Sequence, residues 1–409
     1  MRRSSLRTAA ARAVVVAAAG ALAATALAAP ASADTVPGSV PPDQDPFYKA
    51  PANIGTYAPG AIVATRAFTP KAGNVADTAN AWQVSYRTND SHGTPELAVT
   101  SVLVPKKAWT GSGARPVVSV QAAEDSTGSQ CAPSYGLASG DLFASTAAIY
   151  AGPMLSKGWA VAMPDFEGPK SVFMAGVQAG HAVLDGIRAV QRFKDSGIAA
   201  RAPWALAGYS GGAQATGWAA QLQPSYAPDV KLAGASMGGI PADPEAVARS
   251  LDGGVFSGFE AAAAVSLGTE YPEMDIDALM NDKGEQAMKD AAGKCLTSLL
   301  TSFAFKKLAD YSTVPDPLAV PRVRAVLKAN TLGAAAPSVP VFDYHANTDE
   351  IVPAAQDDAM VKAWCSRGAT VHIVRDAIGE HALEMVVRQN DSVNFLDDRF
   401  AGKPPVNDC

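Results

Sequence analysis

The residues best able to do chemistry lie in the stretch ALAGYSGGAQAT, in which Ser210 stands between Gly208 and Gly212. The pattern G-x-S-x-G is typical of a nucleophile elbow, a strained turn from a strand to a helix around which only small neighbours can pack. A plain glycine-rich turn matches the same five residues by chance. The apolar run WALAG before Ser210 and the Gly/Ala-rich helical segment after it favour the elbow. We therefore predict that Ser210 is a nucleophile.

A serine nucleophile needs a base to take its proton and an acid to orient that base. In enzymes with a nucleophile elbow, the acid and then the histidine follow the serine, each on a loop after a later strand. The expected strand VPVFDYHA and the loop behind it offer Asp343, Asp349 and Glu350. Asp343 lies inside the strand and is expected to face neighbouring structure, whereas Asp349 lies in the loop NTDEIVP. We predict Asp349 as the acid.

The same order of residues selects one histidine from five. Three of the five break this order: His92, His181 and His345. His372 lies inside the expected strand TVHIV, where a histidine is more often a packed or hydrogen-bonded core residue. His381 lies in the loop RDAIGEHAL after that strand. We predict His381 as the base.

The oxyanion formed when a serine attacks an acyl carbon needs hydrogen-bond donors in a dry site. The backbone N–H of Gly211, directly after the nucleophile, is the first expected donor. The second is expected in the loop EDSTGSQCAPSY, where Glu124 and Asp125 are the nearest candidates. Asp165, after the expected strand WAVAM, is interpreted as a structural loop cap and not as a catalytic residue.

The segments around these residues predict the elements that position them. Three β-type segments resemble a meander at the edge of a sheet: residues 60–68, 81–88 and 97–105. From residue 115, short apolar runs alternate with helical stretches, which predicts a parallel sheet with helices on both faces and an active site at the carboxyl ends of its strands. Residues 243–332 break this rhythm with helical pieces. We predict an α/β core made of residues 34–242 and 333–409, with 243–332 as an inserted helical cap.

The first 33 residues have the pattern of a secretory signal peptide. Four arginines precede or enter an alanine-rich apolar run that ends in Ala31-Ser32-Ala33. A membrane anchor is a poor alternative, because the run is rich in small residues and is followed at once by Pro and Gly. We predict cleavage between Ala33 and Asp34, secretion, and no integral membrane segment in the mature chain. Removing four arginines and no acid takes the formal charge from −6 to −10, so nucleic acid is not an expected partner.

The four cysteines favour disulfides over a metal site. No CxxC occurs, and no histidine lies within four residues of a cysteine, so no metal is expected. An even number in an exported chain predicts two disulfides, for which the sequence allows three pairings. The cysteines are Cys131, Cys295, Cys365 and Cys409.

With these residues assigned, the chain resembles the secretory lipase family of fungi and actinobacteria. The likeness covers most of the chain after residue 33 and includes QDPFYKAP, EDSTGSQCAPSY, GYSGG, YHANTDEIVP and GEHA. It implies an α/β-hydrolase fold with a helical cap, and a catalytic triad of Ser210, Asp349 and His381. It also implies an oxyanion hole of Gly211 and Asp125.

The resemblance further implies how the cysteines pair and what the cap does. Cys131 would join Cys295 in the cap, which leaves Cys365 with Cys409. The apolar stretches 253–267 and 302–305 either line an acyl-binding site or simply pack the cap.

These features together predict a secreted hydrolase of lipid esters, a triacylglycerol lipase or carboxylesterase that acts through an acyl-enzyme without metal or cofactor. Its expected partners are a lipid or small ester and, transiently, a lipid–water interface. One alternative is an acyltransferase on the same scaffold, in which an alcohol replaces water. A second is a non-catalytic binding protein with a hydrolase scaffold, against which the complete triad argues.

Overall fold

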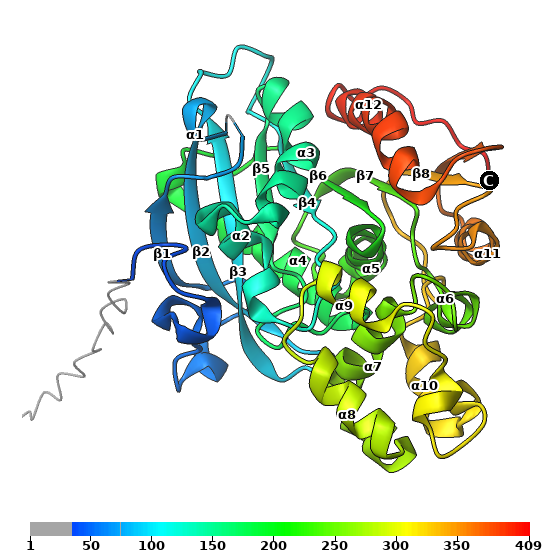
Figure 1. The fold of residues 1–409 in the computed structure, drawn as a ribbon. Coiled ribbons are helices and arrows are strands. Elements are labelled where there is room, and N and C mark those ends of the chain that lie inside the picture. The colour runs from blue at the N-terminus through cyan, green and yellow to red at the C-terminus, as the bar shows by residue number, and fades with distance from the viewer. Residues whose placement is uncertain (1–34, 74) are drawn as a thin grey trace, which may run out of the picture. The chain divides into compact units, whose positions relative to one another are not determined.

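One mixed sheet carries the strands that end at the predicted catalytic residues (Figure 1). The computed structural model describes residues 35–73 and 75–409. Within them the strand order is β1-β2-β3-β5-β4-β6-β7-β8-β9. The first three strands are antiparallel, β3 pairs antiparallel with β5, and the pairs from β5 to β9 are parallel. The strands are β1 (Ile62–Phe68), β2 (Ala79–Asn89), β3 (Pro95–Pro105), β4 (Val117–Gln121), β5 (Ala160–Pro164), β6 (Trp204–Tyr209), β7 (Leu232–Gly238), β8 (Val341–Ala346) and β9 (Val371–Asp376).

Helices cover both faces of the sheet. Neighbouring residues of β4 pack on opposite sides: Val117 joins the core beneath α4, α5 and α11, and Val118 joins the core beneath α2, α3 and α12. The central strands β4, β5 and β6 are buried along their whole length, as expected for parallel strands covered on two sides. These helices are α2 (Pro133–Ser139), α3 (Leu142–Ser156), α4 (Gly176–Arg192), α5 (Gly211–Tyr226), α11 (Ala354–Cys365) and α12 (His381–Phe400), and a short α1 (Val75–Thr78) precedes β2.

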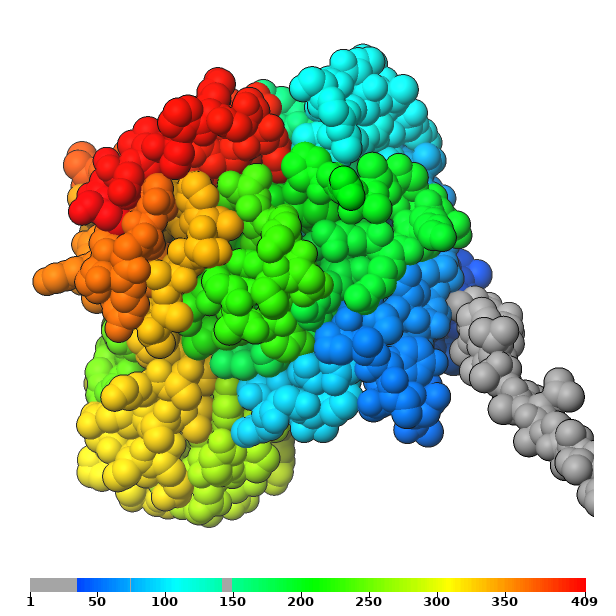
Figure 2. All heavy atoms as spheres, turned by 180° about the vertical axis from the view of Figure 1, so that it is seen from behind, coloured from blue at the N-terminus to red at the C-terminus, as the bar shows by residue number. Residues whose placement is uncertain are grey.

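Five further α-helices lie between β7 and β8. They are α6 (Pro244–Leu251), α7 (Gly258–Glu270), α8 (Asp282–Ala291), α9 (Leu296–Phe303) and α10 (Pro321–Ala329). Four of them, α7 to α10, share a separate core, and α6 packs in a smaller cluster with Val352. Among the described residues that connect these helices, one isolated β-bridge occurs, between Met280 and Ser312. Figure 2 shows the yellow-green and yellow surface of this segment gathered at one end of the view. We call this segment the helical cap.

Two disulfides join Cys131 to Cys295 and Cys365 to Cys409. This is the pairing that the family resemblance implies. The first ties the loop after β4 to the residue before α9 in the helical cap.

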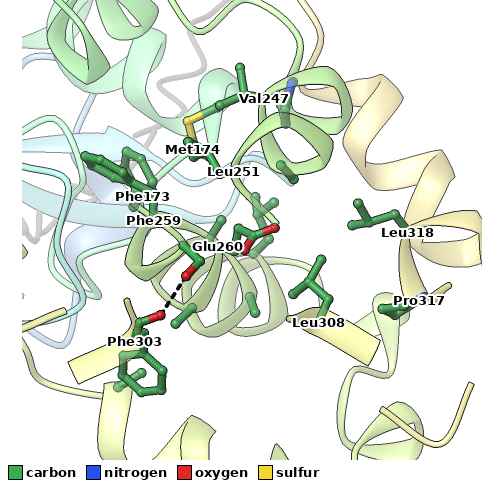
Figure 3. A pocket seen from close by; sticks show the side chains of 18 of the residues that line it. Phe173, Met174, Val247, Leu251, Phe259, Glu260, Phe303, Leu308, Pro317 and Leu318 are labelled. Carbon is green, nitrogen blue, oxygen red and sulfur yellow. Dashed lines mark hydrogen bonds between the residues drawn. The ribbon is translucent and has the colours of Figure 1, made fainter. Parts of the chain in front are cut away.

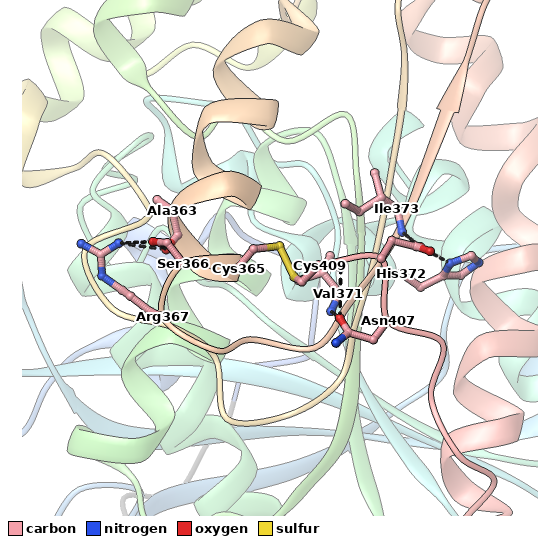
Figure 4. Close-up of a disulfide and its surroundings, with 10 residues drawn as sticks. Ala363, Cys365, Ser366, Arg367, Val371, His372, Ile373, Asn407 and Cys409 are labelled. Carbon is pink, nitrogen blue, oxygen red and sulfur yellow. Dashed lines mark hydrogen bonds and ion pairs between the residues drawn. A yellow bond between two sulfur atoms is a disulfide. The ribbon is translucent and has the colours of Figure 1, made fainter.

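The second disulfide ties the C-terminal segment to the end of α11 (Figure 4). That segment runs along the outer strand β9, where Asp408 donates its backbone N–H to the carbonyl of Val371 and Asp408 Oδ2 accepts the backbone N–H of Ile373. These contacts cover polar groups that an edge strand otherwise leaves open.

The sequence located most elements to within a few residues, with two differences near the site. His381 was expected in a loop, but it is the first residue of α12, with Glu380 as the N-cap. Helices α2 and α3, between β4 and β5, were not individually expected. The predicted signal peptide and its cleavage position lie outside the described residues. Within the described part, no helix is long and apolar enough to span a membrane.

Candidate active site

Ser210 occupies a strained turn between β6 and α5. Its backbone has φ 56° and ψ −128°, a conformation that costs a non-glycine residue about 1–3 kcal/mol. Two backbone hydrogen bonds hold it there: Ser210 N–H donates to the carbonyl of Gly238 at 2.9 Å, and the Ser210 carbonyl accepts from Gln214 N–H at 3.1 Å. The turn also needs Gly212, because a Cβ there would lie 2.0 Å from the carbonyl oxygen of Gln121. The elbow geometry therefore agrees with the G-x-S-x-G pattern.

The three predicted residues, from the turn before α5, the loop after β8 and the start of α12, are joined by consecutive hydrogen bonds. His381 Nε2 lies 2.8 Å from Ser210 Oγ, and His381 Nδ1 lies 2.6 Å from Asp349 Oδ2. The imidazole is fixed from its backbone as well, since Tyr209 donates its hydroxyl to the His381 carbonyl and Glu350 accepts the His381 N–H. This geometry can move a proton from the serine hydroxyl to the imidazole.

Asp349 is held as a carboxylate by four donors. Its Oδ1 accepts the backbone N–H groups of Ile351 and Val352 at 2.9 and 2.7 Å. Its Oδ2 faces both His381 and, at 3.2 Å, Nε2 of His345. Burial alone would raise the pKa of Asp349, but the hydrogen bonds from the two histidines outweigh it and hold the pKa below its ordinary value.

His345 is a buried cation that sequence reasoning missed. Its Nδ1 lies 2.8 Å from Asp357 Oδ2, and its Nε2 faces the Val352 carbonyl and Asp349. Both ring nitrogens thus face only acceptors, which requires a proton on each. Burial would lower the pKa of His345, but hydrogen bonds to Asp349 and Asp357 raise it to about 10. The only signal in the sequence was its position four residues before Asp349.

The rejected acids and histidines have other partners. Asp343 lies on β8 at 2.8 Å from Arg375, not at His381. His372 was expected in the core but is half-buried on β9, where it contacts Asp408. The remaining two histidines contact backbone carbonyls: His92 that of Glu270, and His181 that of Asp90. Asp165 accepts hydrogen bonds from Ser134 in the first turn of α2, as a structural cap does.

Asp125 and Gly211 stand beside the nucleophile. Gly211 is the first residue of α5, so its N–H has no partner within the helix. A Cβ on Gly211 would lie 1.8 Å from Asp125 Oδ1, so the side chain of Asp125 is packed against this glycine. Asp125 Oδ1 is buried without a hydrogen-bond partner among the described residues, and burial raises the pKa of Asp125 to about 7 against the attraction of His381. Asp125 lines the pocket described next, whereas Glu124 does not.

A cavity of about 150 Å³ leads from Ser210 into the helical cap. Its lining is overwhelmingly apolar and comes from α6, α7, α8 and the segments around α9 and α10 (Figure 3). Both stretches proposed from the sequence contribute, with Phe259 and Leu267 from the first and Phe303 from the second. Phe305 does not, since it is 70% exposed. Such a cavity suits an extended apolar group. Within the described residues, no group of three or more His, Cys, Asp or Glu side chains could hold a metal ion.

Comparison with known proteins decides the family. The sequence model of the family described as "Secretory lipase" matches residues 142–408. The chain belongs to this family. It is 38% identical to Lipase 6 of Candida albicans, over 90% of this chain and 84% of that protein. It is 34% identical, over 89% of this chain and 83% of the relative, to a protein of Mycobacterium tuberculosis named a probable inactive lipase.

A solved structure confirms the fold class. The X-ray structure of Candida antarctica lipase A in its closed state is similar with a TM-score of 0.84 and 33% identity, covering 90% of this chain and 88% of that one. The predicted resemblance and the predicted α/β-hydrolase fold are therefore confirmed for this chain. Membership of this family supports the conclusion that the chain is an ester hydrolase that acts on lipids.

The choice of Asp349 over Asp343 as the acid beside His381 is testable. We expect Asp349→Asn to lower kcat by about 10⁴-fold, because an amide in that place favours the wrong tautomer of His381. Asp343→Asn is the matched control, which removes the carboxylate facing Arg375 and is expected to lower the free energy of unfolding by about 3 kcal/mol with kcat nearly unchanged. Ester hydrolysis and thermal unfolding measure the two effects. The opposite pattern would move the acid to Asp343.

Proposed function

We propose that the protein is a secreted serine hydrolase that cleaves carboxylic esters of lipids through an acyl-enzyme. The observation that carries the proposal is the hydrogen-bonded chain Ser210–His381–Asp349 at the end of an apolar cavity. The three side chains would act as nucleophile, base and orienting acid, and the cavity can hold the acyl group of the ester. Membership of the secretory lipase family supports the same reaction class.

The proposed reaction has two halves. His381 takes the proton of Ser210 as the serine oxygen bonds to the ester carbon, and the same imidazole then protonates the leaving alcohol as the ester C–O bond breaks. Water, deprotonated by His381, attacks the acyl-enzyme and releases the acid with Ser210 restored. Asp349 keeps the imidazole in the required tautomer and stabilises its charged form.

The oxyanion is assigned to two donors, Gly211 and Asp125. The free N–H of Gly211 is one. The second is the carboxyl of Asp125 in its protonated form, since its Oδ1 is packed against Gly211 and its pKa is about 7. A neutral carboxyl can donate to a developing oxyanion, whereas a carboxylate would repel it.

The relative named a probable inactive lipase raises a non-catalytic alternative. The hydrogen-bond distances of 2.8 and 2.6 Å along Ser210–His381–Asp349 argue against this alternative for the present chain.

Secretion is proposed on three grounds: the signal-peptide pattern of residues 1–33, the family, and the two disulfides, which persist in oxidising compartments.

Ser210→Ala tests the reaction. With p-nitrophenyl esters of increasing chain length and with emulsified triglyceride, we expect the variant to lose at least about 10⁴-fold in kcat, because no oxygen remains to form the acyl-enzyme. Thermal unfolding controls for folding. Adding an alcohol and analysing the products separates hydrolysis from acyl transfer. Undiminished hydrolysis in a folded Ser210→Ala variant would contradict the mechanism.

The assignment of Asp125 predicts a pH dependence. Below pH 7 its carboxyl is protonated and donates to the oxyanion; as the pH rises through 7 the donor is lost, so kcat/KM should fall. Asp125→Asn keeps an N–H donor at every pH and should remove this fall. Asp125→Ala has no donor at any pH, so it should lower kcat by about 10²-fold relative to wild type below pH 7 and should not show the fall. Rates from pH 5 to 10 measure the effect. An equal fall in wild type and Asp125→Asn would contradict the role.

A further inference from the structure

One carboxyl stands without a partner in the apolar cavity of the cap. Glu260, in the first turn of α7, lines the cavity together with Phe259, Ala263 and Leu267 (Figure 3). Glu260 is only 6% exposed, and its Oε1 is buried without any hydrogen-bond partner among the described residues. Lys306 and Lys307 also line the cavity, but no ion pair joins either to Glu260 within the described part of the chain.

A structural role as a helix cap does not account for Glu260. The sequence Ser257-Gly258-Phe259-Glu260 has the spacing of a capping box, in which the glutamate would accept the backbone N–H of the serine. Here that N–H donates to the carbonyl of Gly254, and the Ser257 hydroxyl donates to the carbonyls of Gly254 and Phe303. The carboxyl of Glu260 is left to face the cavity.

An unpaired buried carboxyl is costly and calls for a partner. Burial, and then the nearby charge of Asp252, raises the pKa of Glu260 to about 9, so the group is a neutral acid at pH 7. A neutral carboxyl has one O–H donor and one carbonyl acceptor. A hydroxyl group likewise donates one hydrogen bond and accepts others. A neutral carboxyl and a hydroxyl can therefore each donate a hydrogen bond to the other. A cationic group would have to lose its hydration in this apolar lining, which costs far more than burying a hydroxyl.

We propose that Glu260 binds a hydroxyl group on the acyl chain, so that esters of hydroxylated fatty acids are preferred substrates of this site. The inference rests on the proposed function, because it places the acyl chain in the cavity that Ser210 also lines. It deepens that function by naming a substrate class. A site built to bond a hydroxyl discriminates strongly against the analogue that lacks it, because its own polar group then stays unpaired.

A positional series tests the proposal. Esters of one chain length, with the hydroxyl moved along the acyl chain, are compared with the unsubstituted ester by kcat/KM. We expect one position to be preferred by about tenfold or more in wild type. In Glu260→Met the preference should disappear, because the Met side chain has no group that can bond the hydroxyl. Glu260→Gln, which keeps a donor and an acceptor, should retain part of the preference.

The controls separate this proposal from the hydrolase itself. Glu285→Met removes an exposed carboxyl of α8 that does not line the cavity, and it should leave the preference unchanged. Calorimetry measures how tightly the free hydroxylated and unsubstituted acids bind to Ser210→Ala. Because this measurement needs no turnover, it tests the role of Glu260 even if the proposed hydrolase mechanism is wrong. Equal hydroxyl preference in wild type and Glu260→Met at every position, or equal binding of the two acids, would overturn the proposal.

Discussion

The strained backbone of Ser210, with its positive φ, is the constraint on which the rest of the site depends. A residue with φ 56° turns β6 directly into α5, which points the serine oxygen away from the sheet at the carboxyl ends of the strands. The turn closes only where Gly212 can approach the carbonyl of Gln121 on the neighbouring strand β4. The loop after β4 then brings Asp125 against Gly211. The strained turn thus sets the positions of Ser210 and of Gly211, against which Asp125 packs.

A second constraint is the buried carboxylate of Asp349, which contacts His381. Asp349 could not stay ionised in a dry site without donors, and it receives them from two backbone N–H groups, His381 and His345. His345 in turn stays charged because Asp357 faces its other nitrogen. The network therefore extends well beyond three residues, and it joins β8, the loop after it, α11 and the first residue of α12.

Sequence reasoning located Ser210, Asp349 and His381 because each follows an apolar strand in a fixed order, and strand ends on one edge of a parallel sheet meet in space. The residues alone left Glu124 and Asp125 open as oxyanion candidates, and only the family resemblance implied Asp125, the one that packs against Gly211. Sequence reasoning missed His345 as a partner of Asp349, because a histidine inside a strand gives no sign of which side chains face it. Glu260 was equally hidden, since its spacing from Ser257 fits a capping box that the folded chain does not form.

The nucleophile assignment is tested without any mutation by an alkyl fluorophosphonate, which reacts with serines activated by a base. Mass mapping of the labelled protein should find one adduct, on the peptide that contains Ser210, formed by the folded protein and not by the heat-unfolded one. An adduct on another residue of the folded protein, or no adduct at all, would contradict the view that the strained turn at Ser210 creates the reactive centre.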